Sequence, residues 1–165
     1  MKIKAILDYD CINYKEPVLT IMFPYCDLKC DKLNKLPVCQ NSSLLAAPNI
    51  EVSFETIWRY YEQNPLTKGF CFQGMEPLDS DMELYGLIDF IRSGMNCNDP
   101  IVIYTGYNKE EKEDFYKMMK NYGNIIIKWG RYLLGDKPHY DEVLGVYLAS
   151  DNQYAEKLNE TNTNW

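Results

Sequence analysis

Three cysteines that follow an apolar segment near the amino terminus have the spacing of metal ligands. Cys26, Cys30 and Cys39 lie directly after a β-prone run at residues 18–25, where a strand of an α/β sheet would lead into a loop at its carboxyl end. Open α/β sheets bind their ligands at that end. Three thiolates on one loop can hold three irons of a four-iron, four-sulfur cluster and leave the fourth iron open to a small molecule. The spacing therefore predicts an iron–sulfur site.

Two other interpretations of these thiols stay open at the level of sequence. Free cysteine is among the most buried residue types, so the three side chains could be ordinary core thiols. A structural zinc site is the second interpretation, but it needs four ligands. No fourth cysteine lies close by, and the single histidine, His139, is far away in sequence. Cys11, Cys71 and Cys97 are isolated, and we expect Cys71 to be a core thiol on its strand.

The elements that must position this loop alternate along the chain. β-Prone runs predict six strands, at residues 2–7, 18–23, 69–73, 101–105, 124–128 and 143–148. Apolar residues recur at helical period over residues 54–61 and 84–91, and a third helix is expected over 115–123. Ser53 and the pair Asn108 and Glu111 are capping signals, and Gly94 is a stop signal. The order predicts an α/β fold, either a partial (β/α) barrel or an open, mainly parallel sheet of about six strands with flanking helices.

Length, charge and composition narrow the function classes. A chain of 165 residues that is 46% hydrophobic predicts one α/β domain, residues 1–154, with a polar tail at 155–165. A net charge of -7 with scattered lysines argues against a nucleic-acid partner. The first ten residues lack the features of a secretory signal, and no apolar run approaches the ~20 residues of a membrane span, so we expect a cytoplasmic protein without a membrane partner. In a reducing compartment the six cysteines are not expected to form disulfides.

Five segments, in order along the chain, resemble motifs of one enzyme family. The cysteine loop, MFPYCDLKC followed by VCQNSSL, is similar to the cluster loop of the radical S-adenosylmethionine enzymes, especially the activating protein of anaerobic ribonucleotide reductase. GFCFQGMEPL resembles the family strand that ends in G-G-E-P, and IVIYTGYNKEE resembles the later strand with its T-G-Y turn. NIIIKWGRY and ASDNQ are similar to the D-G segment and to the closing G-S-x-N-Q. The resemblance covers most of the chain.

The resemblance implies cofactors, an activity and partners. Cys26, Cys30 and Cys39 would hold a 4Fe-4S cluster that reduces S-adenosylmethionine and generates a 5′-deoxyadenosyl radical. The radical would install a glycyl radical on a partner enzyme such as anaerobic ribonucleotide reductase, with electrons from a flavodoxin-like or other low-potential reductant. S-adenosylmethionine would contact six residues: Gly74, Met75, Glu76, Thr105, Asn152 and Gln153. No side chain is assigned a catalytic role of its own.

The chain also departs from the family pattern. Eight residues separate Cys30 from Cys39 where the family has two, Met75 replaces the second glycine of G-G-E-P, and Lys128 and Trp129 replace the aspartate of the D-G segment. Two alternatives therefore stay open: a radical S-adenosylmethionine enzyme acting on a small molecule or peptide, and a non-catalytic iron–sulfur protein that carries electrons or serves as a partner subunit. From the residues alone, Glu76 could equally be a first-turn acid, since negative charge is favoured at a helix amino terminus.

Overall fold

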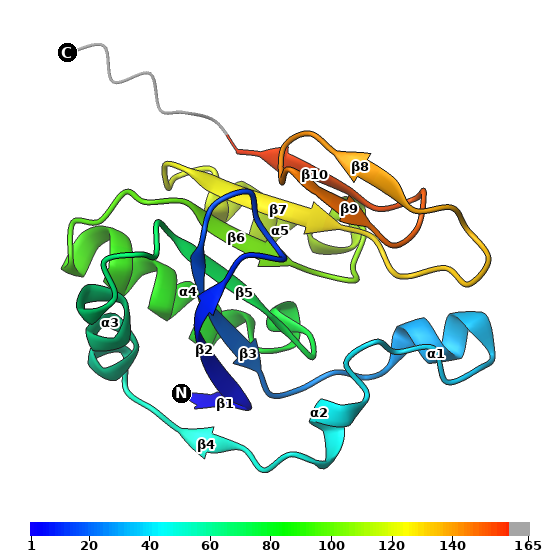
Figure 1. Cartoon of the computed structure of the whole chain (residues 1–165), viewed down its shortest axis with the longest axis horizontal. Helices are drawn as coiled ribbons and strands as arrows, with labels where there is room; N and C mark the ends of the chain where they lie inside the picture. Colours follow the sequence, from blue (N-terminus) through cyan, green and yellow to red (C-terminus); the bar gives the residue numbers. More distant parts are fainter. Residues whose placement is uncertain (159–165) are drawn as a thin grey trace.

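Four parallel strands form the centre of the sheet. In the computed structural model, which describes residues 1–158, these strands are β3 (Val18–Phe23), β5 (Phe70–Gly74), β6 (Ile101–Tyr104) and β7 (Ile125–Trp129). An antiparallel strand completes each edge: β2 (Ala5–Asp10) beside β3 and β10 (Tyr154–Lys157) beside β7. The order is β10-β7-β6-β5-β3-β2, and the sheet is open rather than closed into a barrel (Figure 1). The expected α/β fold with an open, mainly parallel sheet is confirmed.

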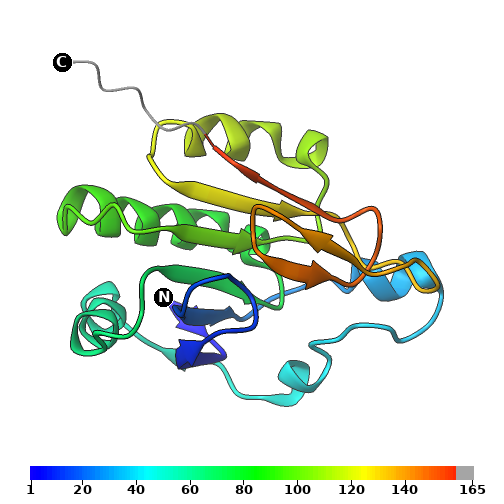
Figure 2. The same ribbon diagram turned by 45° about the horizontal axis from the view of Figure 1, so that its top comes forward.

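Three helices form a single layer on one face of this sheet (Figure 2). They are α3 (Phe54–Gln63), α4 (Asp81–Asp89) with its π-helical continuation η2 (Phe90–Gly94), and α5 (Glu113–Met119). Alternate strand residues such as Ile21, Phe72 and Ile103 are fully buried against the apolar faces of these helices. This alternation follows from the pleat, which sends successive side chains to opposite faces. The larger core of the protein lies on this side.

A hairpin and a loop cover the opposite face. Leu144 and Leu148, from the hairpin of β8 (His139–Asp141) and β9 (Val146–Leu148), pack with Tyr14 of the β2–β3 loop over a second buried cluster. The strand that we expected at residues 143–148 is therefore shorter and belongs to this hairpin, not to the main sheet. The remaining elements are short: β1 (Lys2–Ile3), β4 (Ile50–Glu51), α1 (Lys29–Asn34), α2 (Ser43–Ala46), η1 (Pro77–Asp79) and η3 (Lys109–Lys112).

The carboxyl-terminal edge of the sheet corrects the expected domain boundary. Ala155, Glu156 and Lys157, expected in the polar tail, pair with β7 as part of β10, and Leu158 is buried in the larger core. The polar composition concealed this strand because an edge strand has one side open to water. The rest of the expected tail, residues 159–165, lies outside the described residues. Among residues 1–158, no helix is long and apolar enough to cross a membrane.

Ser53 caps α3 as the sequence predicts, which gives a direct test of the fold. Its side-chain oxygen accepts a hydrogen bond from the backbone N–H of Thr56 at 3.1 Å. We expect Ser53→Ala to lower the free energy of unfolding by about 1 kcal/mol, because that N–H loses its partner at the helix end. Urea denaturation would measure the change. Ser42→Ala is the matched control: Ser42 precedes α2 but makes no capping hydrogen bond, so its replacement should change stability far less.

Candidate cofactor site

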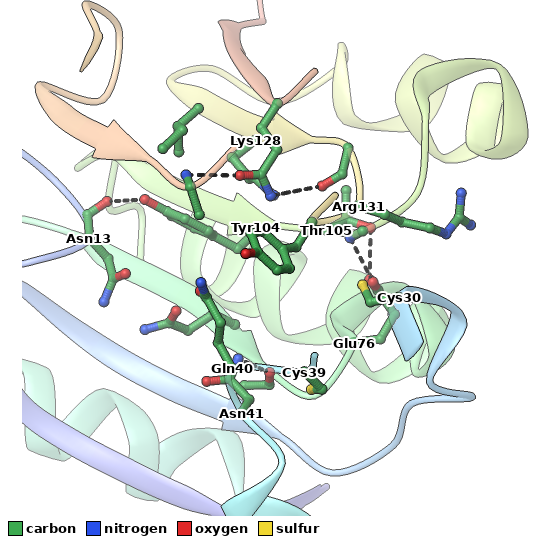
Figure 3. Close-up of a pocket in the computed structure, with 18 of the residues that line it drawn as sticks. Asn13, Cys30, Cys39, Gln40, Asn41, Glu76, Tyr104, Thr105, Lys128 and Arg131 are labelled. Atoms are coloured by element: carbon green, nitrogen blue, oxygen red, sulfur yellow. Dashed lines mark hydrogen bonds between the residues drawn. The ribbon is translucent and has the colours of Figure 1, made fainter. Parts of the chain in front are cut away.

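A cavity of about 360 Å³ lies at the carboxyl ends of the parallel strands (Figure 3). Its walls come from the cysteine loop after β3, from the ends of β5, β6 and β7, and from strand β9. This is the end of an open α/β sheet at which ligands bind. The β2–β3 loop forms part of the wall, because Tyr104 donates a hydrogen bond from its hydroxyl to the carbonyl of Asn13 at 2.7 Å.

Three polar side chains of the strands form the floor of the cavity. Gln73, Tyr104 and Lys128 all line it, and each comes two residues after a buried residue of the same sheet face. Those buried residues are Cys71, Val102 and Ile126. Sequence reasoning missed Gln73 and Tyr104 and treated Lys128 only as a departure from a motif. The period of two was the available signal, because a polar residue in step with buried neighbours at a strand's carboxyl end must face the same side.

The three predicted cluster ligands all line this one cavity. Cys26, Cys30 and Cys39 are partly buried and free of disulfides. Burial raises the pKa of Cys26 to about 11 and also raises the pKa of Cys39 above its usual value. Both thiols are therefore protonated near neutral pH, and a metal that binds them must displace these protons. Cys71, by contrast, is fully buried in the second core, as expected of a core thiol.

The donor set fits a cluster better than a single ion. In residues 1–158, the one group of three possible ligand atoms within 4.8 Å of one another is Cys26, Asp27 and Asp79, not the three cysteines. A single ion needs its ligands that close together, whereas a 4Fe-4S cluster distributes its thiolates over different irons. The three thiols line one cavity without all lying within 4.8 Å of one another, and among the described residues no histidine lines it, so they could bind separate irons but not, as placed, one ion.

Asp31 shapes the long segment between the second and third cysteines. Its Oδ1 atom accepts hydrogen bonds from the backbone N–H groups of Val38 and Cys39, each at 2.8 Å. The segment thus begins with the short helix α1 and folds back so that Cys39 returns to the cavity. Lys35 makes this reversal in the left-handed region, with φ 54°.

Asn34 ties the same segment to the loop after β7. Its side-chain amide donates to the carbonyls of Cys30 at 2.8 Å and Tyr132 at 3.0 Å. Its Oδ1 atom accepts from the backbone N–H of Leu134 at 2.8 Å. A residue of the long segment between Cys30 and Cys39 therefore joins two walls of the cavity.

Glu76 lies at the end of β5 and is held entirely by protein groups. Its Oε1 atom accepts from the Thr105 hydroxyl at 2.8 Å and from the Leu78 N–H at 3.1 Å, and its Oε2 atom accepts from the Gly106 N–H at 2.8 Å. Burial raises the pKa of Glu76, and these three hydrogen bonds oppose the rise. Because the Leu78 bond caps η1, the first-turn interpretation of this acid is supported. Both Glu76 and Thr105 line the cavity.

Gly74 and Met75 line the cavity beside Glu76. Gly74 has φ 98°, and a Cβ at this position would lie 2.8 Å from the Met22 Cα of β3. Only glycine meets both conditions. The close approach that requires it is to the neighbouring strand, whereas the side chain of Met75 occupies part of the space that a second glycine would leave open.

The two residues predicted from the closing motif behave differently. Gln153 lines the cavity, donates from Nε2 to the Gly130 carbonyl at 3.2 Å and accepts from the Ala149 N–H at 3.1 Å. Asn152 is exposed, and among the described residues it is not part of the cavity wall. It donates to the carbonyl of Arg131 at 2.9 Å and accepts from the Ser150 hydroxyl at 2.8 Å, so it joins the turn at residues 150–153 to the loop after β7.

Comparison with known proteins does not assign this chain to a family. No family model, curated protein or solved structure matches this chain. The function must therefore be argued from the motifs and from the cavity that they form.

Lys128 gives a pH-dependent test of the cavity. Burial lowers the pKa of Lys128 from 10.5 to about 8. Between these values the unfolded chain binds more protons at this residue than the folded chain, so its contribution to the free energy of unfolding rises with pH, by about 3 kcal/mol over the interval. We expect the difference in stability between the parent and Lys128→Met to change by this amount from pH 8 to pH 10.5. Urea denaturation of both proteins across that range measures it, and a constant difference would contradict the prediction.

Proposed function

We propose that this protein is a radical S-adenosylmethionine enzyme that uses a 4Fe-4S cluster held by Cys26, Cys30 and Cys39. One observation carries the proposal: the three cysteines, the GMEP turn and the TGY turn come from three separate parts of the chain and line a single cavity at the carboxyl ends of the strands. These are the segments in which the sequence resembles that family. Turns that follow neighbouring parallel strands meet at one edge of the sheet in any case, so the support lies in the residue types that they bring there: three thiols beside the buried side chains of Glu76 and Thr105.

The chain's own residues would bind and orient the ligand. When bound, the reduced cluster supplies the electron that splits S-adenosylmethionine into methionine and a 5′-deoxyadenosyl radical. Gly74, Met75 and Glu76 form a wall that is fixed by the hydrogen bonds of Glu76 to Thr105 and Gly106. A wall held this firmly can keep a ligand in one orientation without reorganising, which favours a reaction between two groups in the same cavity.

The partner that the proposal favours is a macromolecule. Ile12 and Tyr147 line the cavity but are 80% and 75% exposed, so two large side chains with apolar surface stand open to water at its mouth. A macromolecule that docks over the mouth would cover both of them. We propose a glycyl-radical enzyme such as anaerobic ribonucleotide reductase as the partner, a flavodoxin-like or other low-potential protein as the reductant, and the cytoplasm as the location. A small molecule or peptide is the alternative substrate.

A second candidate function is an iron–sulfur protein that does not cleave S-adenosylmethionine. Two observations favour it. Met75 lines the cavity at the position where the resembled motif has its second glycine, and the carboxylate oxygens of Glu76 already accept three hydrogen bonds from the protein. Such a protein would carry electrons or serve as a partner subunit.

Release of 5′-deoxyadenosine separates the two functions. The chain would be reconstituted anaerobically with iron and sulfide, reduced with dithionite and incubated with S-adenosylmethionine, and the product followed by chromatography. We expect slow release by the chain alone and faster release with its partner, because docking completes the orientation of the reacting groups. Cys30→Ala is the control that should release none. An intact cluster without release, with or without candidate glycyl-radical enzymes, would assign the protein to the second function.

A further inference from the structure

Lys128 places a positive charge inside the cavity. It is the fourth residue of β7, on the same sheet face as Ile126, and its side chain lines the cavity while only 6% of the residue is exposed (Figure 3). In the register of the sheet it lies beside Tyr104 of β6. The ammonium group is therefore at the floor of the cavity, away from bulk water.

Among the described residues, no carboxylate forms an ion pair with this charge. The Nζ atom lies 5.9 Å from the centroid of the Tyr104 ring and donates one hydrogen bond, to the carbonyl of Gly130 at 2.8 Å, which leaves two of its three N–H donors for other partners. The salt bridges found among residues 1–158 pair other lysines and Arg131 with carboxylates, and none includes Lys128. Glu76 is the carboxylate that acts on Lys128 most strongly, but its oxygens are occupied by Thr105, Gly106 and Leu78.

A buried ammonium without a counter-charge is costly, so its presence in a cavity suggests a role in binding. An anionic group of a ligand would supply both the missing charge and acceptors for the free N–H donors. The chain as a whole has a net charge of -7, so general attraction of anions does not explain a cation at this position.

The number of cations favours a carboxylate over a phosphate. A phosphate group carries up to two charges and three acceptor oxygens, and it is usually bound by several donors. Arg131 is the next cation on the cavity wall, but both of its terminal nitrogens bond to Glu111, at 2.7 and 2.9 Å. One free ammonium matches a single monoanion.

We infer that Lys128 forms a carboxylate-binding subsite on the floor of the cavity. The carboxylate could belong to the methionyl part of S-adenosylmethionine or to a second substrate. In the segment that resembles the D-G motif, this chain has Lys128 where the motif has an acidic residue. The inferred subsite therefore depends on a residue that the motif does not contain.

The first experiment does not depend on the proposed function and uses acetate as the probe. The full-length chain would be reductively methylated with formaldehyde and cyanoborohydride, and modification of Lys128 followed by mass spectrometry. A carboxylate bound to the ammonium holds its proton and covers it, so we expect modification in sodium acetate to be at least about threefold slower than in sodium chloride of equal ionic strength. The exposed Lys137 should react equally fast in both salts. Equal rates at Lys128 would overturn the inference.

The second experiment rests on the proposed function and identifies the source of the carboxylate. Equilibrium dialysis would compare S-adenosylmethionine with its decarboxylated analogue on the reconstituted parent, on Lys128→Met and on the control Lys137→Met. If the methionyl group supplies the carboxylate, Lys128→Met binds S-adenosylmethionine at least about tenfold more weakly and binds the analogue with nearly unchanged affinity. If the parent binds both equally and acetate still protects Lys128, the subsite serves a second substrate. If the parent binds neither, the proposed function fails, and the acetate result alone decides the inference.

Discussion

Replacing Cys26, Cys30 or Cys39 with alanine should abolish assembly of the iron–sulfur cluster. The parent chain, reconstituted anaerobically with iron and sulfide, is expected to bind about four irons and to show the broad visible absorbance of a cluster. Because the three thiols line one cavity and no histidine or fourth cysteine joins them there, each removal leaves only two thiolate ligands. Two ligands cannot hold three irons in place, so each variant should lose essentially all bound iron. Iron and acid-labile sulfide content measure the loss.

The other cysteines provide matched controls for this result. Cys11 is exposed and Cys97 partly buried, and neither lines the cavity. Cys11→Ala and Cys97→Ala should therefore bind iron like the parent. Folding of every variant would be checked by circular dichroism, so that loss of iron is not confused with loss of structure. If Cys11 or Cys97 proved to be required while Cys39 did not, the assignment of the site would be wrong.

Asp27 and Asp79 extend the test to the other possible metal site. Asp27, Asp79 and Cys26 lie close enough together to hold a single ion. If that group were the true site, Asp79→Asn would remove the metal, whereas Cys39→Ala would not. The cluster assignment predicts the reverse, since Asp79 accepts a hydrogen bond from the Tyr107 hydroxyl and has no part in the cluster.

The fold was predictable where the local signals were strong. Residues such as Ile125, Ile126 and Ile127 are buried on both faces of the sheet, as central parallel strands require, and the Oγ atom of Ser53 accepts the Thr56 N–H at the start of α3. The edge strands of the sheet were harder to predict from the sequence. Strand β10 has the sequence YAEK, which carries no hydrophobic alternation, and its position depends on pairing with β7 rather than on its own composition. Such a strand can be recognised only from its neighbours.

The sequence predicted those features of the site that depend on residue type alone. Clustered cysteines indicated the loop, and the strand-end turns indicated Glu76 and Thr105 as ligand contacts. The structure places both residues at the cavity, joined by a hydrogen bond. The sequence could not predict which partner each polar side chain would form hydrogen bonds with. Asn152 was expected at the ligand but bonds to the carbonyl of Arg131, because the turn geometry, not the residue type, decides where its amide points.

The cysteine segment shows most clearly where sequence and structure differ. Eight residues separate Cys30 from Cys39 where the resembled motif has two, and the sequence predicts that the six extra residues are an insertion that a cluster tolerates. Lengthening such a segment from two residues to eight costs only about 1.2 kcal/mol of chain entropy, at roughly 0.6 kcal/mol for each doubling. The structure adds that the segment is ordered by its own contacts, since Asp31 holds its return and Asn34 joins it to the loop after β7.

Excising residues 33–38 should therefore separate cluster binding from the integrity of the cavity. The deletion restores the two-residue spacing as CDLKCDKCQN, so we expect the variant to bind about four irons like the parent. It also removes the hydrogen bonds that Asn34 makes to Tyr132 and Leu134, each contributing about 1 kcal/mol, so the free energy of unfolding should fall by about 1–3 kcal/mol. Iron content and urea denaturation measure the two effects. Asn34→Ala keeps the loop length and is the matched control, expected to lose comparable stability while also keeping its iron. A folded excision variant that binds no iron, beside an Asn34→Ala variant that does, would show that the three thiols of this chain converge only across the long segment.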